Sequence, residues 1–449
     1  MFGGRRAFPG GITLPRRESR APDLPIRQLA FAPLLSLPLR QDAGGELKAV
    51  VREGEEVVRG QLLARAGSET GAALHAPATG RVVRLVEQPD SAGGTVAVLE
   101  LEPFPGDTQE YPGSPGPEPE TLDPARIVSD IRAAGIVGMG GARRPTHARL
   151  HLPPGEQIKL LVLNGIEVEH VFSRVPALLQ AEADSLLLGA RYLLRAMGAA
   201  RAVLAVEEQD AALARAMVAA APEGMPLALR ALTPRYPQGA EELLLRVLSG
   251  AGRGASTSAL QQGARCFNLA TVAEVGRLLS NGQCMTDQVI TLAGSALREP
   301  GNYRVPLGTP VRFALEYAGL GPNPARVLAG GPMRGTALAS LDVPITKGVP
   351  GLLALDQQAA GALEPPLPCI RCGECVAVCP LQLQPAQLGL LARKGEIKVM
   401  HEEYYLDACF ECGCCSYVCP SHIPLVQMFR AAKAQWRRRQ PAAAGEVAA

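Results

Sequence analysis

The stretch CIRCGECVAVCP at 369–380 is followed by a second stretch with the same cysteine spacing, CFECGCCSYVCP at 409–420. Each contains the run C-x2-C-x2-C-x3-C-P, in which three cysteines stand three positions apart and a fourth follows before a proline. The two runs hold eight of the chain's 11 cysteines. This duplication predicts one small domain with two equivalent thiolate sites.

The run is typical of domains that hold two [4Fe-4S] clusters, where three cysteines wrap one cubane and the fourth ligates the other. Iron and sulfide also suit soft thiolate ligands. The fourth cysteine of each run is therefore expected to cross to the neighbouring cluster. The predicted ligand sets are Cys369, Cys372, Cys375 and Cys419 for the first cluster, and Cys409, Cys412, Cys415 and Cys379 for the second.

Zinc and disulfide bonds are the alternative uses of these cysteines. Structural zinc sites usually take four ligands in two pairs, which gives no reason for the repeated x3-C-P ending. Disulfides fit poorly in a long chain without a secretory signal. The three remaining cysteines, Cys266, Cys284 and Cys414, are expected to pack as small hydrophobic residues.

Length and composition indicate a soluble protein of several domains. A chain of 449 residues is too long for one core, and its net charge of +2 offers no argument for nucleic-acid binding. No segment is long and apolar enough for a membrane span. Within the N-terminal arm at 1–29, the first stretch MFGGRRAFPGGITLP has two arginines without an apolar region behind them. This argues against export, so a reducing cytoplasm is expected.

Residues 30–102 are predicted to form short strands separated by glycine turns. The phrases VREGEEVVRGQLLA and HAPATGRVVRL resemble the flattened β-barrel of biotinyl and lipoyl carrier domains. The expected hairpin tip, GSETGAALHAPATG, lacks the lysine that would hold a carrier cofactor. The sequence therefore predicts a docking domain instead of a swinging arm.

A proline-rich linker at 103–124 precedes an α/β domain at 125–284. Here the buried-strand runs 159–165 and 202–208 alternate with Ala- and Leu-rich helical stretches, which predicts a parallel sheet. Ligands of such sheets bind beyond the carboxyl ends of the strands. A small β-rich domain at 285–348, the two-cluster helical domain at 349–436 and a basic tail at 437–449 follow, so the fold class is multidomain α/β plus β.

Motifs along almost the whole chain resemble the C subunit of the Rnf electron-transport complex, a relative of the flavin subunit of respiratory complex I. They include GGITLP, HAPATG, AGIVGMGGA, YPQGAEELL, GNYRVPLGTPV, GGPMRG and both cysteine runs. The resemblance implies a barrel-sandwich domain, a complex I-like flavin domain, an SLBB-like domain and a two-cluster ferredoxin domain.

The same resemblance implies a function. A peripheral subunit on the cytoplasmic face of the bacterial inner membrane would take a hydride from NADH onto FMN. Single electrons would pass through two [4Fe-4S] clusters to other subunits, including a ferredoxin-like iron-sulfur subunit, and the complex would couple this to ion translocation. The residues that match the family's flavin site are Gly138, Gly140, Gly141, Arg149, Asn164, Glu167, Glu169, Tyr236, Gly239, Glu241, Asn268 and Thr271.

The chain also departs from the family's pattern. Arg143-Arg144 replaces a Gly-Phe pair, Arg149 replaces a lysine, and the acidic pair expected within 173–177 is absent. Bulky arginines could occlude a flavin or rebuild the site around phosphate. We therefore expect weakened FMN and NADH binding, and the alternative function is a non-enzymatic iron-sulfur relay. A third interpretation is a corrinoid reductase, since such enzymes also contain a flavin and iron-sulfur clusters.

Overall fold

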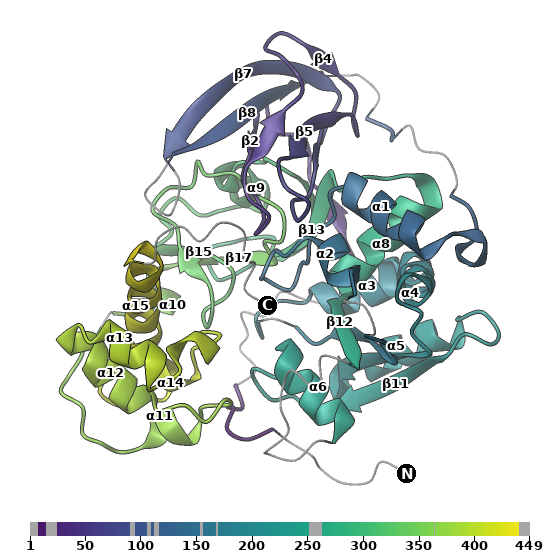
Figure 1. Ribbon diagram of the computed structural model, residues 1–449. Coiled ribbons are helices and arrows are strands. Elements are labelled where there is room, and N and C mark those ends of the chain that lie inside the picture. Colours follow the sequence, from purple (N-terminus) through teal and green to yellow (C-terminus); the bar gives the residue numbers. More distant parts are fainter. Residues whose placement is uncertain are drawn as a thin grey trace.

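The fold is that of a computed structural model, which describes residues 8–14, 25–89, 95–105, 109–111, 116–152, 156–167, 169–250, 263–362 and 364–439. Figure 1 shows four parts, with a β-domain at the top, an α/β domain at the right, a second β-domain in the middle and a helical domain at the lower left. The four parts match the predicted fold class. Much of the N-terminal arm, the linker and the basic tail lies outside the described residues.

The first domain is a flattened barrel of two small sheets. One contains β2 (Leu35–Pro38), β8 (Thr95–Pro103), β7 (Gly80–Pro89) and β4 (Glu56–Val57) in that order, and the other contains β3 (Leu47–Ala49), β5 (Leu62–Ala66) and β6 (Leu74–His75). Side chains alternate, so Leu35 and Leu37 on β2 are fully buried while the residues between them are not. The core lies between the sheets.

The hairpin tip of this barrel contacts two other domains. The Nζ of Lys347 donates to the carbonyl of Ala73 at 2.6 Å and to that of Gly135 at 2.7 Å. A Cβ on Gly135 would lie 2.0 Å from the Ala73 carbonyl oxygen, so only glycine permits this approach. The tip is thus held against the rest of the chain, and the docking role stays a prediction.

The α/β domain contains a four-stranded parallel sheet with strand order β11-β10-β9-β12. The strands are β9 (Leu160–Gly165), β10 (Arg201–Glu207), β11 (Leu227–Leu232) and β12 (Ala264–Asn268). Its helices are η1 (Pro119–Thr121), α1 (Pro124–Ala133), α2 (Thr146–Leu150), α3 (Arg174–Ala181), α4 (Ala183–Met197), η2 (Glu208–Asp210), α5 (Ala211–Ala219), α6 (Glu241–Ser249) and α8 (Leu269–Asn281). The predicted parallel sheet is confirmed. The bounds of β9 and β10 differ by one residue from the predicted strands at 159–165 and 202–208.

Helices cover both faces of this sheet. Leu244 and Leu245 of α6 pack with Val162 and Ala205 on one face, while α4 and α8 belong to the core on the other. The two helices lie close because Gly189 and Gly276 each face the partner helix's backbone. A Cβ on either glycine would lie about 2 Å from a carbonyl oxygen. Because α8 follows β12 directly in the chain, its N-terminus lies at the carboxyl end of β12.

The middle domain contains a six-stranded sheet with the order β1-β14-β13-β17-β15-β16. The elements are β1 (Arg27–Gln28), β13 (Asp287–Ala293), β14 (Gly301–Pro306), α9 (Val311–Tyr317), β15 (Arg326–Ala329), β16 (Thr336–Ala337) and β17 (Gly351–Leu355). Both β1 and β17 lie outside the range 285–348 that the sequence predicts for this domain. Strand β1 pairs with β14 through Arg27 and Tyr303, so the N-terminal arm completes the edge of a distant sheet.

The helical domain repeats one backbone pattern twice. Its elements are α10 (Gln357–Ala360), α11 (Glu374–Ala377), α12 (Pro385–Lys394), α13 (Ile397–Glu402), η3 (Leu406–Ala408), α14 (Cys414–Tyr417) and α15 (Leu425–Arg439). In each motif a residue with positive φ (Arg371, Glu411) and a glycine N-cap with positive φ (Gly373, Gly413) precede a short helix. The first three residues of the predicted basic tail, Arg437, Arg438 and Arg439, form the last turn of α15.

A buried network of charges joins the three larger domains. Asp287 of the middle sheet pairs with Arg59 of the barrel at 2.7 Å and with Arg304 at 2.9 Å. Glu182 of the α/β domain pairs with Arg304 and, at 2.8 Å, with Arg277. Because a buried charge that loses its partner costs several kcal/mol, about 3–5, this network fixes how the domains are arranged.

Candidate functional site

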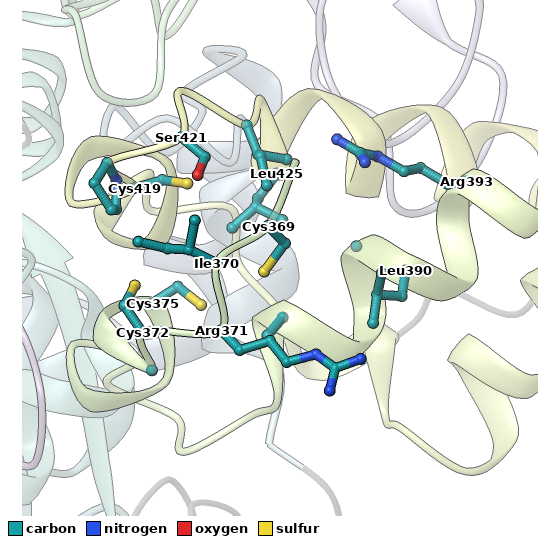
Figure 2. Close-up of a pocket in the computed structure, with 15 residues that line it drawn as sticks. Cys369, Ile370, Arg371, Cys372, Cys375, Leu390, Arg393, Cys419, Ser421 and Leu425 are labelled. Atoms are coloured by element: carbon teal, nitrogen blue, oxygen red, sulfur yellow. The ribbon is translucent and has the colours of Figure 1, made fainter. Parts of the chain in front are cut away.

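Four sulfur atoms from both cysteine runs border one cavity in the helical domain. The cavity is lined by Cys369, Cys372, Cys375 and Cys419, with Ile370 and Arg371 beside them. Figure 2 shows that the four sulfur atoms face a common space. The structure thus brings together the first predicted ligand set, including the cysteine that crosses from the second run.

The second set also lies together and is more buried. The charges of Cys409, Cys412 and Cys379 all raise the pKa of Cys415, which shows that these four groups are neighbours. Burial raises the pKa of Cys409 to about 11, whereas a hydrogen bond with Cys414 lowers the pKa of Cys412. Cys414 itself is fully buried.

The donor geometry fits a cluster better than a single ion. Among the described residues, no three His, Cys, Asp or Glu side chains converge closely enough to hold one metal ion. The first four cysteines instead surround a space, as thiolates around a cubane do. The ligand assignment of all eight cysteines remains a prediction.

A second cavity lies at the carboxyl ends of β9 and β12, as expected for a parallel sheet. Its volume of about 320 Å³ is at the lower end of the roughly 300–1,000 Å³ of small-molecule sites. Nine residues that match the family's flavin site line it: Gly138, Gly140, Arg149, Asn164, Glu167, Gly239, Glu241, Asn268 and Thr271. The structure therefore gathers residues spread over more than 130 positions.

The glycine-rich loop and the N-terminus of α8 form one wall of this cavity. The hydroxyl of Thr271 accepts the backbone N–H of Met139 at 2.9 Å, and Asn268 caps α8 by accepting the N–H of Ala270 at 3.1 Å. A Cβ on Gly140 would approach Asn268 to 3.8 Å and narrow the space between them. A helix N-terminus beside a glycine loop is suited to an anionic group such as phosphate.

Arg149 and Glu241 form another part of the lining. The Arg149 guanidinium donates to both carboxylate oxygens of Glu241, at 2.7 and 2.9 Å, and to the carbonyl of Cys266 at 2.8 Å. It also lies over the Phe267 ring, 4.9 Å from the centroid. The arginine that replaces the family's lysine is thus held by Glu241, Cys266 and Phe267. Its planar guanidinium donates to Glu241 and Cys266 from two different nitrogens, whereas lysine has only one.

Three predicted flavin-site residues lie elsewhere. Gly141 is an exposed turn residue with φ +103°. The Tyr236 hydroxyl donates to the Cys412 carbonyl at 2.6 Å, and burial raises its pKa. Glu169 is 1% exposed, and its carboxylate accepts the N–H groups of Met333 and Arg334. Burial raises the pKa of Glu169 to about 7. Tyr236 and Glu169 therefore connect the α/β domain to other domains.

Only one of the two unusual arginines reaches the cavity. Arg144 is exposed and borders it, whereas Arg143 packs against Gly348, whose Cβ would lie 2.8 Å from the Arg143 Cγ. Burial lowers the pKa of Arg143. Crowding of a flavin by both side chains, which the sequence led us to expect, is therefore not what the structure has.

Three residues at or beside the cavity were not among the residues predicted from the sequence. Arg334 and Phe410 line it but come from the middle and helical domains. Arg174, 1% exposed, donates to the carbonyl of Met139 at 3.2 Å and to Asn268 at 3.3 Å, so it ties the loop to the cap of α8. A lone arginine within the apolar stretch VFSRVPALL was the available signal for Arg174; nothing local marks the other two.

Family comparisons divide the chain in the same order. The RnfC barrel sandwich hybrid domain matches residues 6–103 and the Nuo51 FMN-binding domain matches residues 131–277. The SLBB domain matches residues 289–337 and the 4Fe-4S dicluster domain matches residues 367–423. These matches confirm the predicted series of domain types. No helix among the described residues could cross a membrane.

Three relatives extend over most of the chain. The C subunit of an ion-translocating oxidoreductase complex of Pseudomonas aeruginosa is 38% identical over 96% of this chain, which spans 56% of that protein's length. A protein of the same name from Rhodobacter capsulatus is 33% identical, covering 96% of this chain and 83% of its own length. The C subunit of the proton-translocating ferredoxin:NAD(+) oxidoreductase complex of Clostridium ljungdahlii is 31% identical, covering 89% and 88%.

These relatives, the matching barrel domain and the four domain types in one order lead to one conclusion: the chain belongs to the family of C subunits of Rnf-type ion-translocating oxidoreductase complexes.

Proposed function

We propose that this chain is the electron-input subunit of an Rnf-type complex, which passes electrons between NADH and ferredoxin-side partners. The observation that carries the proposal is the adjacency of a flavin-type cavity and a cysteine group. Phe410, which follows Cys409, lines that cavity, and Tyr236 reaches the Cys412 carbonyl. FMN, when bound, would supply the conversion of a two-electron hydride into single electrons, which clusters cannot perform.

The cavity's own residues can hold FMN. Gly138 and Gly140 keep side chains out of the space beside the N-terminus of α8, which is suited to hold the FMN phosphate. Asn164 is fixed for binding, since its side chain donates to the Gly239 carbonyl at 2.9 Å and accepts the N–H of Ile166 at 3.0 Å. NADH is proposed to enter from the open side, past Arg144.

The two cysteine groups divide the path. The group of Cys409, Cys412, Cys415 and Cys379 adjoins the cavity and would receive electrons first. The group around Cys372 lies at the surface, with that cysteine exposed and Ile370 68% exposed. We assign the eight cysteines as ligands of two [4Fe-4S] clusters, and the exposed cluster as the exit toward other subunits.

The relay alternative is not favoured. It requires a flavin cavity that has been filled or lost, whereas the cavity is open and Arg143 is turned away from it. The Nuo51 FMN-binding match also spans the cavity's loop, sheet and helix. The resemblance further supports a peripheral position on the cytoplasmic face of the inner membrane, with a ferredoxin-like iron-sulfur subunit among the partners.

Anaerobic purification followed by two titrations tests this function. The protein should contain about eight iron atoms per chain, the number in two cubanes. It should bind FMN stoichiometrically, and NADH should then bleach the flavin and reduce both clusters. Iron and sulfide without any FMN binding, with clusters reduced only by dithionite or a ferredoxin, would support the relay instead.

A further inference from the structure

The turn between β15 and β16, residues 330–335, lies where three domains meet. A Cβ on Gly331 would lie 2.6 Å from the carboxyl carbon of Glu169 in the α/β domain. A Cβ on Gly413 in the helical domain would lie 2.6 Å from the Met333 carbonyl oxygen. The turn is therefore packed between Glu169 of the α/β domain on one side and Gly413 of the second cysteine run on the other.

Both neighbouring domains hold the backbone of Arg334 in this turn. Its N–H donates to the Glu169 carboxylate at 2.7 Å, and its carbonyl accepts from the Arg430 guanidinium at 2.9 Å. Arg430 in turn pairs with Glu411 at 2.9 Å, beside the second cysteine run. Because the Arg430 guanidinium is charged, its bond to the Arg334 carbonyl is stronger than a neutral hydrogen bond, and bonds on both sides leave the turn little freedom.

The side chain of Arg334 faces both redox sites. It lines the cavity with Phe410, and its guanidinium lies 6.0 Å from the centre of the Phe410 ring. Phe410 directly follows the predicted ligand Cys409, so the guanidinium lies beside the second cysteine group as well as in the lining of the cavity. The other cavity arginines differ, since Arg149 is matched by Glu241 and Arg144 is exposed.

We propose that Arg334 acts on electron transfer through its fixed positive charge. This charge raises the reduction potentials of both the cavity flavin and the adjacent cluster. Reduction adds negative charge to either group, and a fixed cation nearby stabilises that charge. Hydrogen bonds, net charge and exposure set cluster potentials, so the same cation affects both sites. This inference rests on the proposed function for its flavin half only.

The test compares Arg334→Met with a matched loss of charge in the same hairpin, Arg326→Met, in the full chain loaded with iron, sulfide and FMN. Arg326 begins β15 and does not line the cavity. Potentials are measured by optical titration for the flavin and by electron paramagnetic resonance for the clusters. Arg334→Met is expected to shift each equilibrium about tenfold toward the oxidised form, or about 30 mV for the flavin and about 59 mV for the adjacent cluster.

Arg334→Lys keeps the charge and should therefore keep both potentials near their wild-type values. Arg326→Met should leave both potentials unchanged. Unchanged potentials in Arg334→Met, with iron and FMN contents equal to wild type, would overturn the proposal. So would loss of FMN without a change in the cluster potential, since Arg334 would then serve flavin binding alone. If the wild-type chain binds no FMN, the proposed function fails, yet the cluster potential still decides the role of Arg334. If Arg334→Met fails to fold, Arg334→Gln replaces it, with Arg334→Lys as the variant that keeps the charge, and unchanged potentials in Arg334→Gln overturn the proposal.

Discussion

In the helical domain the sulfur atoms come from two runs of identical spacing, whereas the flavin-type cavity takes its lining from the loop at 138–149, three later segments and two other domains. The repeated backbone of the first, with positive φ at Arg371 and Glu411, is a local property of each motif. The cavity depends on how strands, helices and domains come together. The spacing of the cysteines in the sequence therefore predicts the two groups directly. The effect of a substitution near the cavity can be judged only once the position of its side chain is known.

The largest expected effect tests whether Cys419 of the second run shares a cluster with the first three cysteines of the first run. Cys369→Ser and Cys419→Ser should each lower the iron content from about eight to about four atoms per chain. Because both residues border one cavity, the double variant should lose no more iron than either single variant. Iron analysis after anaerobic purification gives the answer, and complete iron loss in the double variant would mean that the sets do not cross.

Cys414→Ser is the matched control, because Cys414 is buried between ligands but belongs to neither set. It should keep about eight iron atoms, although its hydrogen bond to Cys412 predicts a changed potential. Loss of one cluster in this variant would show that Cys415 was assigned wrongly.

Glu169 tests the contact between the α/β domain and the turn of the middle domain, because its carboxylate accepts the N–H groups of Met333 and Arg334. Its pKa is raised from 4.5 to about 7, so its stabilising contribution is complete below pH 4.5 and is lost as pH rises through 7. Glu169→Gln should remove this dependence. The stability difference between the two proteins should change by on the order of 3 kcal/mol between pH 4.5 and pH 8.

Denaturant unfolding at a series of pH values measures this effect, with the exposed Glu316→Gln as control. A Glu169→Gln protein with the same pH dependence as wild type would show that the Glu169 carboxylate is already ionised in the folded chain at low pH.

Thr271 tests the wall of the cavity itself. Thr271→Val removes the acceptor of the Met139 N–H and leaves that buried donor unsatisfied, at a cost of about 1–3 kcal/mol. FMN affinity should fall about tenfold as the loop loosens, which FMN titration measures. Thr309→Val, an equally buried threonine in the middle domain, should lower stability without changing FMN affinity. Equal affinity losses in both would indicate a general loss of structure.

The smallest expected effect concerns the arginine pair. Arg144→Phe restores the family's aromatic residue at the cavity and should tighten FMN binding by about 1 kcal/mol, or roughly fivefold. Arg143→Ala should have no effect on FMN binding, because that side chain packs against Gly348. Calorimetric titration of each variant separates the two, and a larger gain from Arg143→Ala would reverse the assignment.

The sequence predicts most of the fold and a large part of the site, and the failures have a physical pattern. The parallel sheet follows from the apolar run at 159–165, and Gly140, Asn268 and Thr271 do line the cavity. Arg334 and Phe410 could not be found, since no local feature of the chain reports that two other domains reach this cavity. The direction of a side chain was equally hidden, as the divergent positions of the neighbours Arg143 and Arg144 show.

The meeting of Cys419 with the first three cysteines also bears on how the chain is made. During synthesis, residues 369–375 leave the ribosome well before Cys419, so three thiols of that site must wait without their fourth partner. A nascent chain that has reached Cys415 already carries all four cysteines of the buried group, whereas the exposed group is complete only when Cys419 follows. Neither site can therefore be completed by the chain's own thiols until the second run has emerged, so all four ligands of either set are available only from that late stage of synthesis onward.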